Sequence, residues 1–236
     1  MREPAAPVVL ITRPQAAARR FALQVEALGL RHVIAPLLQI VGVPHDAGAL
    51  RDARGLVFTS ENGVRFAGPG KGRPAWCVGP RTADCAQAAG YDVTEGPGDA
   101  AGLIPLIGDL GPGWLHPHGA HVAARLPVQG IVVYDQLALP LPPGAVALLQ
   151  GETPVILPLF SPRSARLAAG AARAAQSSGG AAIWTVPISA AADAAWRDAW
   201  PGGAARCVVA DQPDAEGILR AIRAMRDTER SPPGAG

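Results

Sequence analysis

The feature that most constrains the fold of this chain is a strand-turn-helix pattern that occurs twice. The segments "GLVFTSENGVRFAG" (55–68) and "VILPLFSPRSARLAAG" (155–170) each run from apolar residues through a hydroxyl residue into a helix-like stretch. Aligning the two segments places Ser60 opposite Ser161. An apolar run of strand length followed by a helical run is typical of a β-α unit, so both parts of the chain are predicted to contain this unit.

Two more pairs of segments extend this repeat. Residues 98–107 align with residues 213–222, and residues 77–90 align with residues 187–200. All three pairs occur in the same order along the chain. The former alignment matches Asp99 with Asp214, and the latter places Gly79 opposite Ser189. The repeat therefore has the scale of a domain, and a chain of 236 residues is long enough for two α/β domains with cores of their own.

The composition argues against a membrane span. Hydrophobic residues make up 49% of the chain and charged residues 17%, and no apolar run has the length of a transmembrane helix. The first residues, "MREPAAPVVLITRPQ", reach only a short apolar stretch and lack the h-region and cleavage site of a signal peptide. We therefore expect a cytoplasmic protein that does not bind membranes.

The cysteine and charge content argue against a disulfide-bonded, a zinc-binding or a nucleic-acid-binding protein. Cys77, Cys85 and Cys207 have no CxxC spacing, so we expect reduced thiols rather than disulfides or a zinc site. A net charge of +2 with a single lysine, Lys71, gives no clustered basic patch, which argues against a nucleic-acid partner. The arginines still allow local contacts with anions.

Alternating apolar and helical runs predict parallel sheets. Residues 7–14 have the pattern of a buried strand, and 15–29 that of an amphipathic helix ended by Gly29. Short apolar runs alternate with helical ones over 55–126, where "AHVAARL" forms the last helical run. The same alternation returns from 153 onward, as expected for βαβ units around a parallel sheet.

Two extended segments mark where the chain crosses between domains. Residues 31–41 contain Pro36 and residues 130–143 are rich in proline, so both suit connecting strands better than central ones. The predicted first domain is discontinuous and contains residues 1–35 and 140–226, and the inserted second domain contains residues 38–132. The two connectors are residues 33–41 and 130–139, and residues 227–236 form a flexible tail.

Candidate binding residues lie where strands end and helices begin, because ligands of open α/β sheets bind beyond the carboxyl ends of the strands. These residues are Thr12, Arg13, Thr59, Ser60, Asn62, Gly79, Thr82, His118, Gly119, Ser161, Arg163 and Ser189. Almost none of the positions is acidic, and helix starts of this kind present N–H groups and a positive dipole end to anions. Two such rims facing each other would bind a polyanion. The alternative is that these side chains only cap helices, and both interpretations stay open.

Other candidates for chemistry are three histidines and a tyrosine. His116, His118 and His121 offer two ligands across a proline with no acidic partner fixed nearby, so we expect no metal site. The Gly-x-Ser-x-Gly elbow of hydrolases and the GxGxxG of dinucleotide-binding proteins do not occur. Tyr134 lies in the second connector, where its phenol acts either as a general acid toward a leaving hydroxyl or as an amphipathic residue at a strand edge.

An ordered set of segments resembles the uroporphyrinogen-III synthase family. The set spans nearly the whole chain and consists of "VLITRP", "LVFTSENGV", "CVGPRTADCAQAAGYDV", "GDAAGLIPLI", "GIVVYDQ", "FSPRSA" and "PIS". The resemblance implies an α/β protein with two flavodoxin-like parallel-sheet domains. It also implies that a two-stranded β connector joins them and that the first domain is discontinuous.

The resemblance also implies a reaction. In this family linear hydroxymethylbilane loses water, its D ring inverts through a spiro intermediate, and the macrocycle closes as uroporphyrinogen III without a cofactor. The substrate is a polycarboxylate, which suits a rim of N–H groups, hydroxyls and arginines. A monomer that takes its substrate from hydroxymethylbilane synthase is the corresponding expectation.

The resemblance also assigns roles to individual residues, namely several substrate-binding residues and one general acid. The matching binding positions are Thr59, Ser60, Asn62, Gly79, Thr82, Ser161 and Ser189, and Tyr134 matches the tyrosine proposed to assist departure of the hydroxyl. Two positions depart from the family pattern. Ala192 stands opposite Thr82 in the repeat, where many members keep a threonine, and His118 stands where an arginine often precedes the glycine.

Two other function classes remain as alternatives. One is a non-catalytic two-domain module that binds an anion or a tetrapyrrole, and the other is a nucleotide-sugar transferase with two Rossmann lobes. The first class usually carries a signal peptide or an output domain, and the second a longer chain with acidic residues at the cleft. The synthase fits better than either, and the sequence does not rank Tyr134, Thr59 and Ser161 as the essential group.

Overall fold

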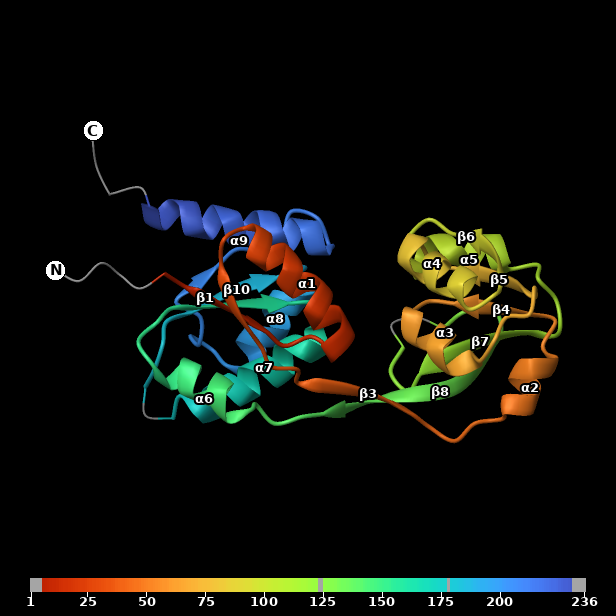
Figure 1. The fold of residues 1–236 in the computed structure, drawn as a ribbon, viewed down its shortest axis with the longest axis horizontal. Helices are drawn as coiled ribbons and strands as arrows, with labels where there is room; N and C mark the ends of the chain where they lie inside the picture. Colours follow the sequence, from red (N-terminus) through yellow and green to blue (C-terminus); the bar gives the residue numbers. More distant parts are fainter. Residues whose placement is uncertain (1–5, 123–124, 178, 231–236) are drawn as a thin grey trace. The chain divides into compact units, whose positions relative to one another are not determined.

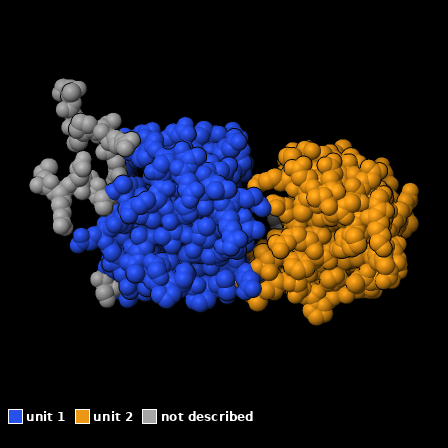
Figure 2. All heavy atoms as spheres, in the orientation of Figure 1, with its two compact units in different colours: residues 1–39, 138–236 blue, residues 40–137 orange. Residues whose placement is uncertain are grey.

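The structure, a computed structural model, describes residues 6–122, 125–177 and 179–230 (Figure 1). The chain divides into two compact units (Figure 2). Unit 1 contains residues 1–39 and 138–236, and unit 2 contains residues 40–137. Each unit has its own mostly parallel sheet, so the fold is α/β and unit 2 is inserted into unit 1.

Within the described residues of unit 1, the strands form a five-stranded sheet in the order β11-β10-β9-β1-β2. The described strands of this sheet all pair in parallel. Its elements in chain order are β1 (Val8–Ile11), α1 (Gln15–Ala27), β2 (Arg31–Ile34), α6 (Pro143–Gln150), β9 (Val155–Leu159), α7 (Pro162–Ala175), β10 (Ile183–Pro187), α8 (Ala190–Ala199), β11 (Arg206–Cys207) and α9 (Ala215–Arg230).

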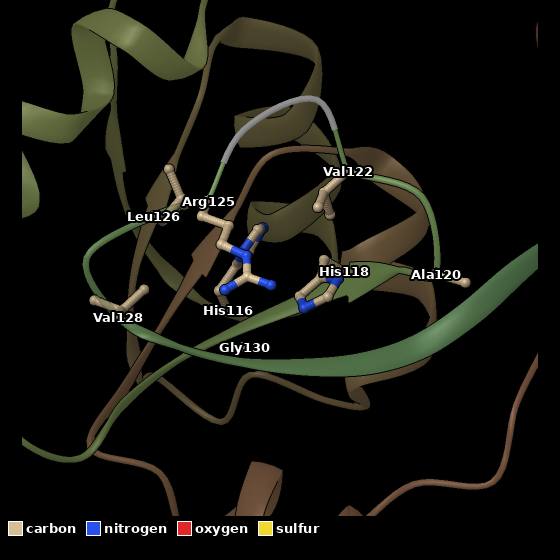
Figure 3. A pocket seen from close by; sticks show the side chains of 8 residues that line it. All are labelled: His116, His118, Ala120, Val122, Arg125, Leu126, Val128 and Gly130. Carbon is tan, nitrogen blue, oxygen red and sulfur yellow. The ribbon is translucent and has the colours of Figure 1, made fainter. Parts of the chain in front are cut away.

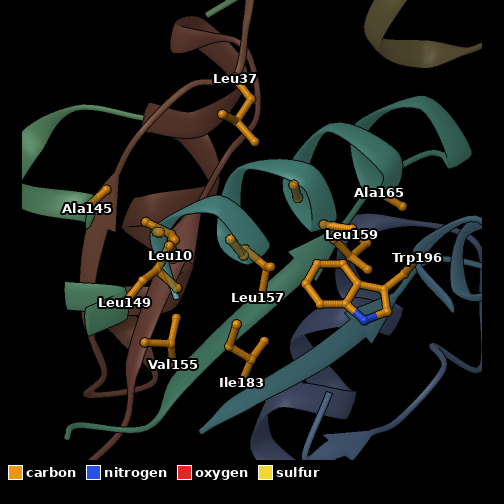
Figure 4. Close-up of a cluster of buried hydrophobic side chains, with 14 of the residues drawn as sticks. Leu10, Leu37, Ala145, Leu149, Val155, Leu157, Leu159, Ala165, Ile183 and Trp196 are labelled. Atoms are coloured by element: carbon orange, nitrogen blue, oxygen red, sulfur yellow. The ribbon is translucent and has the colours of Figure 1, made fainter. Parts of the chain in front are cut away.

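Helices cover both faces of this sheet, as a fully parallel sheet requires. Successive strand residues point to opposite faces, so Leu10 packs toward α6, α7 and α8 (Figure 4), while Val9 and Ile11 pack toward α1 and α9. The amphipathic helix expected at 15–29 is confirmed, because Phe21 and Val25 are fully buried. It ends at Gly29, whose φ of +70° lies in the left-handed region that favours glycine.

The described part of unit 2 contains a six-stranded sheet in the order β3-β8-β7-β4-β5-β6. Its elements in chain order are β3 (Leu38–Gly42), α2 (Ala47–Asp52), β4 (Gly55–Phe58), α3 (Glu61–Ala67), β5 (Pro74–Cys77), α4 (Pro80–Ala88), β6 (Asp92–Glu95), α5 (Ala100–Ile107), β7 (Trp114–Gly119) and β8 (Gln129–Ala138). The pairings from β8 through β6 are parallel. One core lies on the face covered by α2, α3 and α4, and a smaller core on the face covered by α5.

The two chain crossings between the units form an antiparallel strand pair, β3 with β8. The N–H of Leu139 donates to the carbonyl of Leu37 at 2.9 Å, and the N–H of Val43 donates to the carbonyl of Val133 at 3.1 Å. From the first bond to the second, the residue number in the β3 segment rises while that in the β8 segment falls, so the two segments run antiparallel. The divisions at 39/40 and 137/138 lie on this pair.

The structure corrects three details of the sequence prediction. The helical run expected for "AHVAARL" is wrong for the described residues 120–122 and 125–126, which are not helical. The segment predicted as a flexible tail from 227 begins with the last turn of α9, which ends at Arg230, and residues 231–236 lie outside the described part. The segment 130–139 is also more than a connector, since β8 pairs in parallel with β7 inside the sheet of unit 2.

Two short helices, α2 and α6, were not predicted from the sequence. Within the residues described, none of the helices combines the length and the apolar character that a membrane span requires.

Candidate functional site

The carboxyl ends of the parallel strands gather most of the sequence candidates along one edge of each sheet. In unit 2, Thr59 and Ser60 follow β4, Gly79 follows β5, and Gly119 ends β7. The strands β7, β4 and β5 are neighbours in the sheet. The residues that follow them therefore share one rim, as expected for an open α/β fold.

The repeated residues of the sequence are helix caps in both units. The Ser60 Oγ accepts hydrogen bonds from the N–H groups of Asn62 and Gly63 at the start of α3. The Ser161 Oγ accepts one from the N–H of Ser164 at the start of α7. Both serines therefore cap helices.

The second pair of repeated positions caps helices in the same way. An Asp99 oxygen accepts from the N–H of Gly102 at 2.8 Å, and an Asp214 oxygen from the N–H of Gly217 at 2.7 Å. At the third pair, Ser189 accepts from the N–H of Ala192, whereas Gly79 begins α4 without a side-chain cap. The two units thus share a cap geometry at matched positions.

A cavity of about 340 Å³ opens on the rim of unit 2. Its lining residues are Thr59, Ser60, Val78, Gly98, Asp99, Ala100, His118, Gly119, His121, Val122 and Tyr134. It brings together five of the predicted site residues, Thr59, Ser60, His118, Gly119 and Tyr134. The predicted binding residues Asn62, Gly79 and Thr82 do not line it, and the side chain of Thr82 is buried.

Tyr134 is held in place at this cavity by contacts on several sides. Its ring stacks on Phe66 with centroids 6.0 Å apart, and its hydroxyl lies 3.1 Å from the Oγ of Ser60. A Cβ at Gly119 would lie 2.6 Å from Cε2 of the tyrosine ring, so only glycine allows the ring this position. Tyr134 is only 6% exposed, and its hydroxyl is the polar end of an otherwise packed side chain.

The hydrogen bonds of Ser60 set the direction of the bond to Tyr134. A serine hydroxyl has one proton and two acceptor positions. The N–H groups of Asn62 and Gly63 use both acceptor positions, at 3.1 and 3.3 Å. The Ser60 proton is therefore the group that remains for the Tyr134 oxygen, and the phenol proton is left to point into the cavity.

A buried histidine supports the opposite wall of the cavity. The Nε2 of His116 lies 2.9 Å from the Oγ1 of Thr59, and the residue is 4% exposed. Burial, together with the nearby His118, lowers the pKa of His116 to about 4. His116 is therefore neutral at pH 7 and acts as a hydrogen-bond partner of Thr59 rather than as a cation.

A second cavity of about 440 Å³ adjoins the first one (Figure 3). Both cavities are lined by His118 and Val122. The other residues of the second cavity are His116, Ala120, Arg125, Leu126, Val128 and Gly130. The Nδ1 of His118 lies 2.7 Å from the carbonyl oxygen of Gly119, and because a carbonyl only accepts, this nitrogen carries a proton.

Three polar residues of these walls were not predicted as substrate-binding residues. Asp99 lines the first cavity, so the rim of unit 2 is not free of carboxylates. His121, which the sequence considered only as a metal ligand, lies 3.6 Å from a carboxylate oxygen of Asp135. Arg125 lines the second cavity. The only sequence signal for Asp99 was its alignment with Asp214 in the repeat.

In unit 1 the predicted residues lie at the carboxyl ends of β1, β9 and β10, which are neighbouring strands. The guanidinium of Arg13 lies 3.9 Å from the ring centroid of Phe160. The Ser161 hydroxyl donates to the Oγ of Ser164 at 3.0 Å. Arg163 is half-buried in the first turn of α7, and the side chain of Thr12 is buried. This rim presents hydroxyls and a cation on three adjacent strands.

For the residues that the structure describes, no cluster of three or more His, Cys, Asp and Glu side chains is arranged to hold a metal ion. His116 and His118 line the second cavity, and His121 lines the first cavity and lies near Asp135.

Comparison with known proteins gives one family and one fold. A family model for uroporphyrinogen-III synthase HemD matches residues 19–220. Uroporphyrinogen-III synthetase from Helicobacter pylori is similar in structure, with a TM-score of 0.61 and 13% identity over 93% of this chain and 99% of that one. A mutant uroporphyrinogen III synthase from Thermus thermophilus has a TM-score of 0.50 and 17% identity, covering 94% of this chain and 100% of that one. No curated protein sequence gave a significant match. At these identities the solved structures establish the fold.

Proposed function

The chain belongs to the uroporphyrinogen-III synthase family, and we propose that it converts hydroxymethylbilane into uroporphyrinogen III with loss of water and inversion of the D ring. This is the activity of a cyclising hydro-lyase. The observation that carries the proposal is the Tyr134 hydroxyl, which lines the rim cavity of unit 2 and lies within hydrogen-bond distance of the Ser60 hydroxyl. The match of the family model over residues 19–220 supports it.

In the proposed reaction Tyr134 is the general acid. The bond between the hydroxymethyl carbon and its oxygen breaks, and the oxygen leaves as water with the phenol proton. The substituted α-carbon of the D ring attacks the resulting cation to give the spiro intermediate. The bond between this α-carbon and the methylene that joins the C and D rings then breaks, which leaves a cation on the methylene. The free α-carbon of the D ring attacks that cation and closes the inverted macrocycle, and the proton lost from this carbon returns to the tyrosine oxygen. The sum is loss of one water without oxidation or reduction, so the reaction needs no electron acceptor.

Ser60 is a positioning residue in this scheme. Its hydroxyl donates to the Tyr134 oxygen, which orients the phenol proton toward the cavity and stabilises the phenolate after proton transfer. The backbone N–H groups that occupy its lone pairs keep the serine from rotating away.

Substrate carboxylates are proposed to bind along the rims of the units. In unit 2 we assign this role to Thr59, Asn62, Gly79, His118 and Gly119. In unit 1 we assign it to Arg13, Ser161, Arg163 and Ser189. The predicted residues Thr82 and Thr12 are left out because their side chains are buried. N–H groups at the starts of α4, α7 and α8 supply partial positive charge beside these residues. The rims hold the substrate in a conformation in which the D ring inverts, so the rate gain comes mainly from positioning.

The test is a coupled assay in which hydroxymethylbilane is generated in place, the products are oxidised to porphyrins, and the type I and type III isomers are separated by chromatography. We expect type III to dominate above the spontaneous background. If only the type I isomer forms, the chain has the family's fold without its activity, and a non-catalytic module that binds an anion or a tetrapyrrole takes the place of the enzyme.

A further inference from the structure

The second cavity of unit 2 has an unusual balance of charge. Its polar side chains are His116, His118 and Arg125, and among the lining residues that the structure describes there is no carboxylate. Figure 3 shows the Arg125 side chain extending toward His118. The rings of His116 and His118 lie close together, with centroids 4.9 Å apart. The cavity therefore presents one permanent cation and nitrogen atoms of two imidazoles to whatever enters it.

These groups are available for a ligand. Over residues 6–122, 125–177 and 179–230, no hydrogen bond or ion pair of Arg125 is found, so its guanidinium is not committed to a carboxylate of the protein. His118 uses Nδ1 for the carbonyl of Gly119. The Nε2 of His118 lies beside Gly130. A Cβ at position 130 would lie 2.5 Å from this nitrogen, so a side chain there would clash with the ring.

The apolar part of the cavity indicates which anion fits. Ala120, Val122, Leu126 and Val128 line it beside the cationic group. An inorganic phosphate or sulfate has no apolar part for such a wall, whereas a carboxylate on a short aliphatic arm places its methylenes there and its oxygens on the guanidinium fork.

The two cavities are also neighbours, because His118 and Val122 line both. The second cavity therefore lies beside the one that contains Tyr134. We propose that Arg125 and His118 form a subsite for one aliphatic carboxylate arm of the polycarboxylate substrate. The identity of that arm rests on the proposed function, whereas the ability of the cavity to bind an aliphatic carboxylate does not.

The first arm of the test uses sodium propionate as the probe, with the histidine ring signals followed by NMR. We expect saturable shifts of the His116 and His118 rings, and binding weakened about five- to twentyfold in Arg125→Gln, since a charge-assisted pair is lost. Arg65→Gln, which removes another exposed arginine of unit 2, is the matched control and should bind as the wild type does. Shifts without saturation, or equal binding by Arg125→Gln, would overturn the subsite. Sodium sulfate binding as tightly as propionate would overturn its assignment to a carboxylate arm.

The second arm uses hydroxymethylbilane. In Arg125→Gln we expect KM to rise about five- to twentyfold with kcat within about twofold of the wild type, because the contact acts on the ground state and the transition state alike. An unchanged KM would show that the substrate does not use the subsite. If the wild type forms no type III isomer, the proposed function fails, and the propionate titration still decides whether the cavity binds carboxylates.

Discussion

Replacing Ser60 by alanine separates its two roles, capping α3 and directing the Tyr134 proton. The variant loses a side chain that accepts from two N–H groups and donates to the Tyr134 oxygen. An N-cap contributes about 1 kcal/mol, and a neutral hydrogen bond about 1 kcal/mol more. The unfolding free energy of Ser60→Ala should therefore fall by about 2 kcal/mol.

The catalytic effect follows from the direction of the hydrogen bond. Without the Ser60 donor the phenol proton is no longer oriented and the phenolate is less stable, so kcat should fall about tenfold, which equals about 1.4 kcal/mol. Tyr134→Phe removes the acid itself, and its kcat should fall about a hundredfold. Because Ser60 acts through Tyr134, the double variant should be no slower than Tyr134→Phe alone.

The assay is the isomer-resolved conversion of hydroxymethylbilane, measured together with urea unfolding for the four forms of the cycle. Ser60→Thr keeps a hydroxyl and should recover both stability and rate. Ser161→Ala removes the matched cap in unit 1 and shows the cost of losing a cap away from the tyrosine. If Ser60→Ala lowers kcat by the same factor in the Tyr134→Phe background as in the wild type, the positioning role of Ser60 is refuted.

Other predictions test the packing and protonation around the site. Gly119→Ala should lower kcat while the protein stays folded by circular dichroism, because its Cβ displaces the ring of Tyr134, and retention of full activity would contradict this. His116 has a folded pKa of about 4 against an unfolded value near 6.5, so the unfolded chain binds more protons between these values and stability falls as the pH decreases from 6.5 to 4. That decline should reach about 3 kcal/mol in urea unfolding at a series of pH values and be absent in His116→Gln. Leu157→Ala should lower the unfolding free energy by about 3 kcal/mol, since the side chain is 1% exposed in the core of unit 1, and a loss below 1 kcal/mol would show that the site collapses.

Cap residues were predictable from the sequence because capping is local chemistry. Ser60 and Ser161 bond to N–H groups two or three residues along the chain, so the sequence alone places donor and acceptor together. The repeat then predicted that β-α units occur in the same order in both halves of the chain. The ends of the strands were predicted from the ends of the apolar runs. The fold class follows from these short-range signals together with the family resemblance.

The segment after β7 was mispredicted because a distant strand determines its conformation. Its composition favours a helix, but the N–H of Ala120 donates to the carbonyl of Tyr134 at 2.9 Å. The pairing register between β7 and β8 also shifts between His118 and Gly119, and Ala120 and His121 form a bend instead of starting a helix. Tertiary pairing overrides helix propensity here. Arg125 could not be recognised as a wall residue for the same reason.

The helix α6 was missed because its prolines suggested an extended segment. Pro142 is its N-cap and Pro143 its first residue, a position where the missing N–H costs nothing. Because proline was taken only as a residue that ends regular structure, no helix was predicted at Pro143, where α6 begins.

The insertion of unit 2 into unit 1 has a consequence for synthesis on the ribosome. The strand β1 pairs with β9, and about 140 residues separate them, which take about 7–30 s to translate at 5–20 residues per second. Unit 2 is one continuous stretch, and its synthesis is complete within that interval. Meanwhile β1 keeps one edge unpaired, and an unpaired strand edge promotes aggregation. The nascent chain therefore needs protection longest at its own beginning, and slower translation lengthens that exposure.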